Sequence, residues 1–279
     1  LGIYIALVFL GGALLAPWLY WLAQTFDQTF PKLADKPFQR SVTTSLMIMA
    51  VAGMWPLLRA MGATSLREVG LTSPATHRRS LMSGIAWGLC SLAVVAIVVL
   101  VAGARAFESG HSAGYLVRRL FGAVFTAAVV AVTEEALFRG GIFGGLRRVL
   151  NWRFALLISS LVYAITHFLT DAEFSGPVAW YSGLELLPRM LGGLWNWKLL
   201  MPGMLTLTLA GLLLGLMYQR TGNLWFSIGM HASGVLWLVI YRSFTQFVPG
   251  AAVWFWGTNK MVDGWLAAIA LSVMLALLT

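Results

Sequence analysis

The chain has 279 residues, of which 59% are hydrophobic and only 10% are charged, and its formal net charge is +9. With a mean hydropathy of +0.81, it has too few polar residues to cover a water-soluble protein of this size. Soluble enzymes, nucleic-acid-binding domains and disordered regulators are therefore excluded, and the composition indicates an integral membrane protein. We attribute the basic excess to contacts with lipid headgroups and to topology rather than to nucleic acid.

Uncharged apolar runs of spanning length predict the transmembrane helices. In chain order they are Ile3–Leu22, Ser41–Leu58, Ser80–Ala104, Leu120–Phe138, Phe154–Thr170, Leu199–Gln219, Thr221–Tyr241 and Gly264–Thr279. The fold class is therefore all-α, a polytopic membrane bundle of about eight transmembrane helices. No internal repeat or hydrophilic linker separates a second domain, so we expect a single integral membrane domain over residues 1–279.

Two other stretches are rich in Pro, Gly and Trp. Residues 171–198 and 243–259 predict segments that lie on the membrane surface or dip into it. The basic residues divide almost equally between the two sides. The loops that follow the even-numbered spans are short and carry their basic residues close together, which favours that side of the membrane as the cytoplasmic one. The single cysteine, Cys90, excludes an intramolecular disulfide framework.

Four ionisable residues lie inside the predicted spans: Glu134 and Glu135 in the fourth, His167 in the fifth and His231 in the seventh. A charge at the centre of a bilayer costs roughly 2.5–3.5 kcal/mol on insertion scales, so such residues are candidates for function. Glu135 and Arg139 have i, i+4 spacing and can pair on one helix face, whereas Glu134 points about 100° away.

This set of residue types suits the activation of water. A glutamate in a partly dry cavity can accept a proton from water, and two imidazoles can position that water or donate to a developing oxyanion. The alternative is a buried polar network that only holds helices together through interhelical hydrogen bonds. A transporter is a further alternative. It is disfavoured because ionisable groups occur on three spans only and no half of the chain is repeated.

Three motifs now carry a resemblance to a known family. Glu134–Arg139 matches EExxxR, Tyr163–His167 matches an aromatic residue followed by xxx and His, and Ser227–Ala232 contains the third motif around His231. Their order, their spans and the preceding segment 65–71 resemble the CPBP family. This family comprises the CAAX proteases and bacteriocin-processing enzymes, also called the Abi or type II CAAX prenyl endopeptidase family. The resemblance covers roughly residues 65–241.

The resemblance implies an intramembrane glutamic endopeptidase with a cavity open to the cytoplasm. Glu134 and His167 would activate water, His231 would help to bind the oxyanion, and Glu135 with Arg139 would orient the site. The expected partners are the lipid bilayer, a membrane-associated peptide or protein substrate and possible further membrane subunits. The expected location is the bacterial inner membrane, and no cofactor is expected.

Two positions depart from the family pattern. Tyr163 stands where Phe is commoner, and Val235 stands four residues after His231, where Asn is common. If that Asn is an oxyanion donor in relatives, one donor is missing here, and such a loss can cost roughly 3–4 kcal/mol of transition-state stabilisation. Val235 therefore favours the alternative of a catalytically silent membrane scaffold or immunity protein of the same fold.

Zinc-dependent and aspartyl proteolysis are the alternatives to the glutamate mechanism. Zinc held by Glu134, His167 and His231 is possible from the residue types. The sequence, however, has no HExxH motif to place two ligands one helical turn apart. An intramembrane aspartyl dyad is disfavoured, because all the aspartates fall outside the predicted spans: Asp27, Asp35, Asp171 and Asp263.

Overall fold

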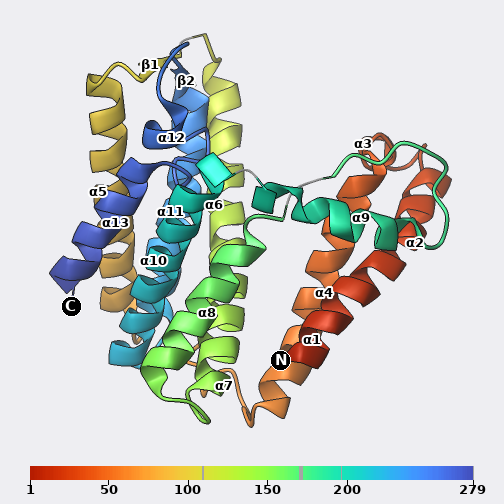
Figure 1. Ribbon diagram of the computed structural model, residues 1–279, viewed down its shortest axis with the longest axis horizontal. Coiled ribbons are helices and arrows are strands. Elements are labelled where there is room, and N and C mark those ends of the chain that lie inside the picture. The colour runs from red at the N-terminus through yellow and green to blue at the C-terminus, as the bar shows by residue number, and fades with distance from the viewer. Residues whose placement is uncertain (109, 170–171, 196, 279) are drawn as a thin grey trace. The chain divides into compact units, whose positions relative to one another are not determined.

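The computed structural model describes residues 1–108, 110–169, 172–195 and 197–278, and helices dominate it (Figure 1). Its elements group into two compact units, one of residues 1–62 and 166–196 and the other of residues 63–165 and 197–279. Helices are expected here, because a backbone in lipid has no water to hydrogen-bond and must satisfy its polar groups within each segment. The predicted all-α membrane fold is confirmed.

The first unit is built around α2 and α4. Its elements are α1 (Gly2–Ala6), η1 (Leu7–Gly11), α2 (Gly12–Thr25), α3 (Pro31–Ala34), α4 (Phe38–Ala60), α9 (Ser182–Met190) and η3 (Leu191–Trp195). The first three run on as one apolar helix of 24 residues. α2 packs against α4 and α9. Their common core consists of Ala16, Phe38, Val42, Leu46, Leu186 and Met190.

The second unit contains the remaining elements. They are α5 (Arg78–Val101), β1 (Arg105–Phe107), α6 (Ala113–Glu135), η2 (Ala136–Phe143), α7 (Gly144–Leu146), α8 (Trp152–Thr166), α10 (Trp197–Thr221), α11 (Trp225–Phe244), β2 (Thr245–Phe247), α12 (Val253–Trp256) and α13 (Trp265–Leu278). α6, η2 and α7 form one continuous helix of 34 residues. α11 packs along both α5 and α6, so it is the central helix of this unit.

Glycines let α5 and α11 approach almost backbone to backbone. A Cβ atom added to Gly84 would lie 2.1 Å from the carbonyl oxygen of Phe226, and one added to Gly229 would lie 2.4 Å from that of Leu81. Small residues at such interfaces are the usual means of close helix packing in membranes. This contact fixes the part of α11 that precedes His231.

A two-stranded antiparallel ribbon joins the ends of α5 and α11. β1 pairs with β2, with Arg105 opposite Phe247. The buried Arg105 guanidinium donates to Thr245 Oγ1, the Thr245 carbonyl and Asn259 Oδ1, at 2.8, 2.6 and 2.8 Å. It also lies over the ring of Tyr241. This arginine therefore ties the ribbon to the loop before α13.

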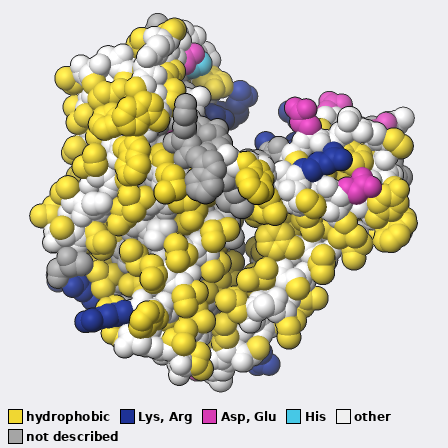
Figure 2. Space-filling view, in the orientation of Figure 1, with side chains coloured by type: hydrophobic (Ala, Val, Ile, Leu, Met, Phe, Trp, Pro, Cys, Tyr) yellow, Lys and Arg dark blue, Asp and Glu magenta, His cyan; other side chains and the backbone are white. Residues whose placement is uncertain are grey.

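Hydrophobic side chains cover much of the face shown in Figure 2, which suits contact with lipid. Every one of the eight predicted apolar runs forms a helix. Five helices of the described part are long and apolar enough to cross a membrane: Gly2–Thr25, Phe38–Ala60, Arg78–Val101, Ala113–Leu146 and Leu200–Thr221. The other three are short or less apolar, because α8 and α13 have only 15 and 14 residues and α11 carries polar residues.

The two predicted surface segments contain more regular structure than the sequence indicated. Residues 182–195 form α9 and η3, and residues 245–256 contain β2 and α12. Pro188 does not prevent α9, because it lies near the end of the helix. The predicted boundaries at Thr170, Asp171 and Thr279 lie outside the described residues.

Candidate active site

The two glutamates lie where α6 passes into a π-helical segment. α6 ends at Glu135, and the next eight residues form η2. π-helical turns are rare and frequent at functional sites. The carbonyl of Phe138 in this segment accepts a hydrogen bond from Ser159 Oγ of α8 at 3.0 Å. Gly140 faces Val69, where an added Cβ would lie 3.0 Å from the Val69 carbonyl oxygen. Neighbouring elements therefore hold η2 in place.

Glu135 and Arg139 form a buried ion pair. Arg139 Nη1 donates to Glu135 Oε1 at 2.8 Å, and the two side chains are 2% and 0% exposed. The pairing predicted from their i, i+4 spacing is confirmed. A charge-assisted hydrogen bond in such a dry place is stronger than one at the surface.

His231 of α11 connects the two glutamates. Its Nδ1 lies 2.7 Å from Glu135 Oε1, and its Nε2 lies 3.8 Å from Glu134 Oε2. Since an ionised carboxylate can only accept hydrogen bonds, Nδ1 is the protonated nitrogen facing Glu135. The Glu135 carboxylate thus fixes the imidazole with Nε2 directed toward Glu134. No sequence pattern predicted this contact.

Tyr163 of α8 packs against the cluster. The Arg139 guanidinium lies 4.4 Å from the centroid of its ring. The ring also meets Phe138 edge to face at 5.1 Å and His231 edge to face at 6.1 Å. Cation–π and edge-to-face contacts of this kind are favourable. The aromatic residue of the second motif therefore supports both Arg139 and His231.

Exposure separates the two carboxylates. The Glu134 side chain is 29% exposed, whereas that of Glu135 is fully buried. Glu135 is occupied by Arg139 and His231. Glu134 is the more accessible of the two carboxylates, with its buried Oε2 facing His231. This arrangement suits a general base held by a rigid frame.

Four of the five predicted site residues thus meet in the second unit: Glu134, Glu135, Arg139 and His231. His167 lies in a turn directly after α8, which ends at Thr166, and it is the second residue of the segment that groups with the first unit. Its predicted role beside Glu134 stays a prediction. Val235 lies one turn after His231 on α11, and its side chain offers no hydrogen-bond donor.

The predicted zinc alternative needs three ligands in one place. Among the described residues there is no group of three His, Cys, Asp or Glu side chains that could hold a metal ion. Glu135, moreover, is already paired with a guanidinium. The zinc alternative stays a prediction, and no step below involves a metal.

Residues 110–114 have the GxSxG spacing of some serine hydrolases. Here Ser112 is the N-cap of α6, and its Oγ accepts a hydrogen bond from the Tyr115 N–H at 3.3 Å. The ring of His111 stacks on Tyr115. These contacts indicate a helix cap rather than an activated nucleophile.

A family model described as type II CAAX prenyl endopeptidase, Rce1-like, matches residues 116–238. The matched segment contains all three motifs and extends from α6 through most of α11. The resemblance seen in the motifs is therefore confirmed over this segment, and the match implies a membrane-embedded protease. A search of curated proteins and a search of solved structures found no match.

Proposed function

We propose that this protein is an intramembrane endopeptidase in which Glu134 activates the water that attacks a peptide bond. The observation that carries the proposal is a continuous chain of contacts. Arg139 holds Glu135, Glu135 holds His231, and His231 Nε2 lies 3.8 Å from Glu134 Oε2. A partly exposed carboxylate beside a fixed imidazole is suited to general acid–base chemistry.

The charges of the cluster balance with a single extra proton. Two carboxylates, one guanidinium and one neutral imidazole carry a net charge of about −1, and one proton on either His231 or Glu134 makes the cluster neutral. Net charge is costly to bury in hydrocarbon. We therefore infer that Glu134 and His231 share one proton, which can move between them as the reaction proceeds.

In the reactive state Glu134 is ionised and His231 carries the proton. The water oxygen attacks the peptide carbonyl carbon, and Glu134 takes a proton from the water. His231 Nε2–H donates to the oxyanion that develops on the carbonyl oxygen. The C–N bond then breaks as Glu134 passes its proton to the leaving nitrogen, giving a carboxylic acid and an amine, and the acid then transfers its proton to the amine.

His167, the substrate and the location complete the proposal. We assign His167 the role of holding the attacking water together with Glu134, as the resemblance implies. The substrate is a membrane-associated protein or peptide, since Glu134, Glu135 and Arg139 lie on a helix that is long and apolar enough to cross a bilayer. We place the enzyme in the bacterial inner membrane, as a single domain that can associate with further membrane subunits.

A catalytically silent scaffold is the second candidate, and Val235 is the observation that favours it. An oxyanion site usually combines several donors, and this residue adds none next to His231. In that case the same cluster would bind a peptide or a membrane partner without cleaving it.

The test compares the intact chain with Glu134→Gln in cells that lack its gene. New peptide termini in the membrane fraction, found by mass spectrometry, are expected with the intact chain and not with Glu134→Gln. Glu185→Gln, in α9, makes the same chemical change outside the cluster and should leave these termini unchanged. Equal termini and equal phenotypes for the intact chain and Glu134→Gln would reject proteolysis and support the scaffold.

A further inference from the structure

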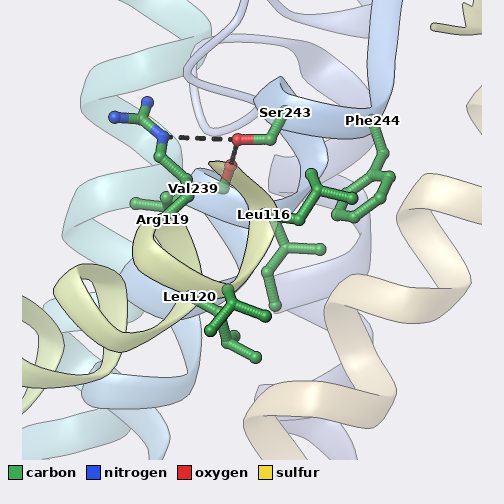
Figure 3. A pocket seen from close by; sticks show the side chains of 8 residues that line it. Leu116, Arg119, Leu120, Val239, Ser243 and Phe244 are labelled. Carbon is green, nitrogen blue, oxygen red and sulfur yellow. Dashed lines mark hydrogen bonds between the residues drawn. The ribbon is translucent and has the colours of Figure 1, made fainter. Parts of the chain in front are cut away.

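A groove lies between α6 and α11, far from the glutamates. It has a volume of about 240 Å³, and almost all of its lining is apolar: Leu116, Val117 and Leu120 from α6, and Val239, Ile240 and Phe244 from α11. Figure 3 shows Leu116, Leu120 and Phe244 around the cavity. Position 119 precedes Glu134 by fifteen residues, or about 22 Å along the helix, so the groove is separate from the candidate active site.

One edge of the groove is polar. Arg119 Nε donates to Ser243 Oγ at 3.4 Å, and Ser243 Oγ in turn donates to the Val239 carbonyl at 2.8 Å (Figure 3). Within the described part of the chain, Arg119 makes no ion pair, so its charge is not neutralised by a carboxylate. Arg118, next to Arg119 in the sequence, and Arg242, next to Ser243, add positive charge to the same helix ends. The acidic residue near this edge is Glu108, whose N–H donates to the Phe244 carbonyl and whose charge acts on Arg105.

The helix length places this edge at the membrane surface. The continuous helix Ala113–Leu146 has 34 residues and is about 51 Å long, whereas the hydrocarbon core is about 30 Å thick. Its ends must therefore reach the headgroup layers. Arg119 immediately precedes the apolar run that begins at Leu120, so the guanidinium lies at headgroup level. The groove is lined from Leu116 to Leu120 and from Val239 to Phe244, so it straddles the boundary between the headgroups and the hydrocarbon.

We propose that this groove binds the headgroup-proximal part of one acyl chain of an anionic glycerophospholipid, with the lipid phosphate held by the Arg119 guanidinium. The apolar lining complements a hydrocarbon chain, and the unneutralised arginines complement a phosphate with net negative charge. A partner helix is about 10–12 Å wide and does not fit a cavity of this volume. Val239, Ile240 and Phe244 lie beyond residue 238, where the family match ends.

Native mass spectrometry of the purified full chain tests the proposal. The protein is incubated with phosphatidylglycerol or phosphatidylcholine that carry identical acyl chains. The intact protein should retain phosphatidylglycerol about fivefold better, which corresponds to about 1 kcal/mol for one basic residue at the membrane surface. Arg119→Gln should abolish this preference and leave phosphatidylcholine retention unchanged.

Two further variants separate the two parts of the lipid site. Val117 is 54% exposed, so Val117→Trp can fill the groove without disturbing the core, and it should lower the retention of both lipids. Lys260→Gln removes one exposed positive charge that does not line the groove, and it should change neither. Circular dichroism checks that each variant keeps its helix content.

Three outcomes would overturn the proposal. The first is a phosphatidylglycerol preference that survives Arg119→Gln, and the second is undiminished retention of both lipids by Val117→Trp. The third is displacement of the lipid by soluble glycerol phosphate at equal concentration, which would show a site for free phosphate rather than for a lipid.

Discussion

Removing Glu135 should destabilise the protein more than removing Arg139, although the two side chains form one ion pair. Glu135 Oε1 holds both Arg139 at 2.8 Å and His231 at 2.7 Å. Glu135→Leu leaves the guanidinium buried without a counter-charge, which costs roughly 3–5 kcal/mol. Arg139→Met leaves the carboxylate facing His231, whose imidazole can take up a proton and neutralise it. The loss should then be about 1–3 kcal/mol.

The double variant Glu135→Leu/Arg139→Met should recover much of the loss. Glu135 Oε2 and Arg139 Nη2 are both buried, with no hydrogen-bond partner among the described residues. The pair is therefore incompletely satisfied, and well-packed apolar residues can replace such a pair at little cost. We expect the double variant to be at least as stable as Arg139→Met, which gives a coupling free energy of about 3 kcal/mol or more between the two positions.

Free energies of unfolding in mixed micelles measure this cycle. Each protein is titrated with sodium dodecyl sulfate and its helix content is followed by circular dichroism. A larger loss for Arg139→Met than for Glu135→Leu would refute the shared role of the Glu135 carboxylate. So would a double variant whose loss equals the sum of the two single losses, because the two groups would then act independently.

Three other predictions concern packing, pH and metals. Gly84→Ala should lower the free energy of unfolding by roughly 1–3 kcal/mol, because the added methyl group overpacks the α5–α11 contact. Gly122→Ala in α6, where an added Cβ has nothing within 4 Å, should raise it by up to about 1 kcal/mol through helix propensity. A hydrogen bond from the Thr64 hydroxyl, and then one from its N–H, lowers the pKa of the Glu68 carboxyl. The stability lost in Glu68→Gln should therefore be largest at neutral pH and vanish as the pH falls through this lowered pKa. Proteolysis should survive treatment with 1,10-phenanthroline, and a loss that added zinc restores would contradict the glutamate mechanism.

Local features of the site could be predicted from the sequence. The contact between Glu135 and Arg139 depends only on helix geometry over one turn, and the structure contains it. The difference between Glu134 and Glu135 follows from the same geometry, since consecutive residues point about 100° apart. The contact between His231 and Glu135 joins residues 96 positions apart. It depends on how α11 packs against α5 and α6, which no local pattern contains.

Helix lengths were less predictable than helix positions. An apolar run shows where the chain can enter lipid, but the turn that ends a helix is set by local hydrogen bonds. α8 ends at Thr166, so the predicted span from Phe154 to Thr170 is too long and His167 falls in the following turn. The π-helical segment after Glu135 was likewise unpredictable, because its apolar sequence is equally compatible with an α-helix.

The membrane explains why the cluster contains four ionisable groups rather than one. An isolated glutamate in hydrocarbon would take up a proton, because its ionised form is costly there, and the protonated side chain would be a poor base. His231 can supply the positive charge that keeps Glu134 ionised, but an imidazolium would itself be costly to bury without Glu135. Glu135 in turn faces Arg139, so every charge has a neighbour of opposite sign. The proposed basicity of Glu134 therefore depends on Arg139, although the guanidinium touches no reacting atom.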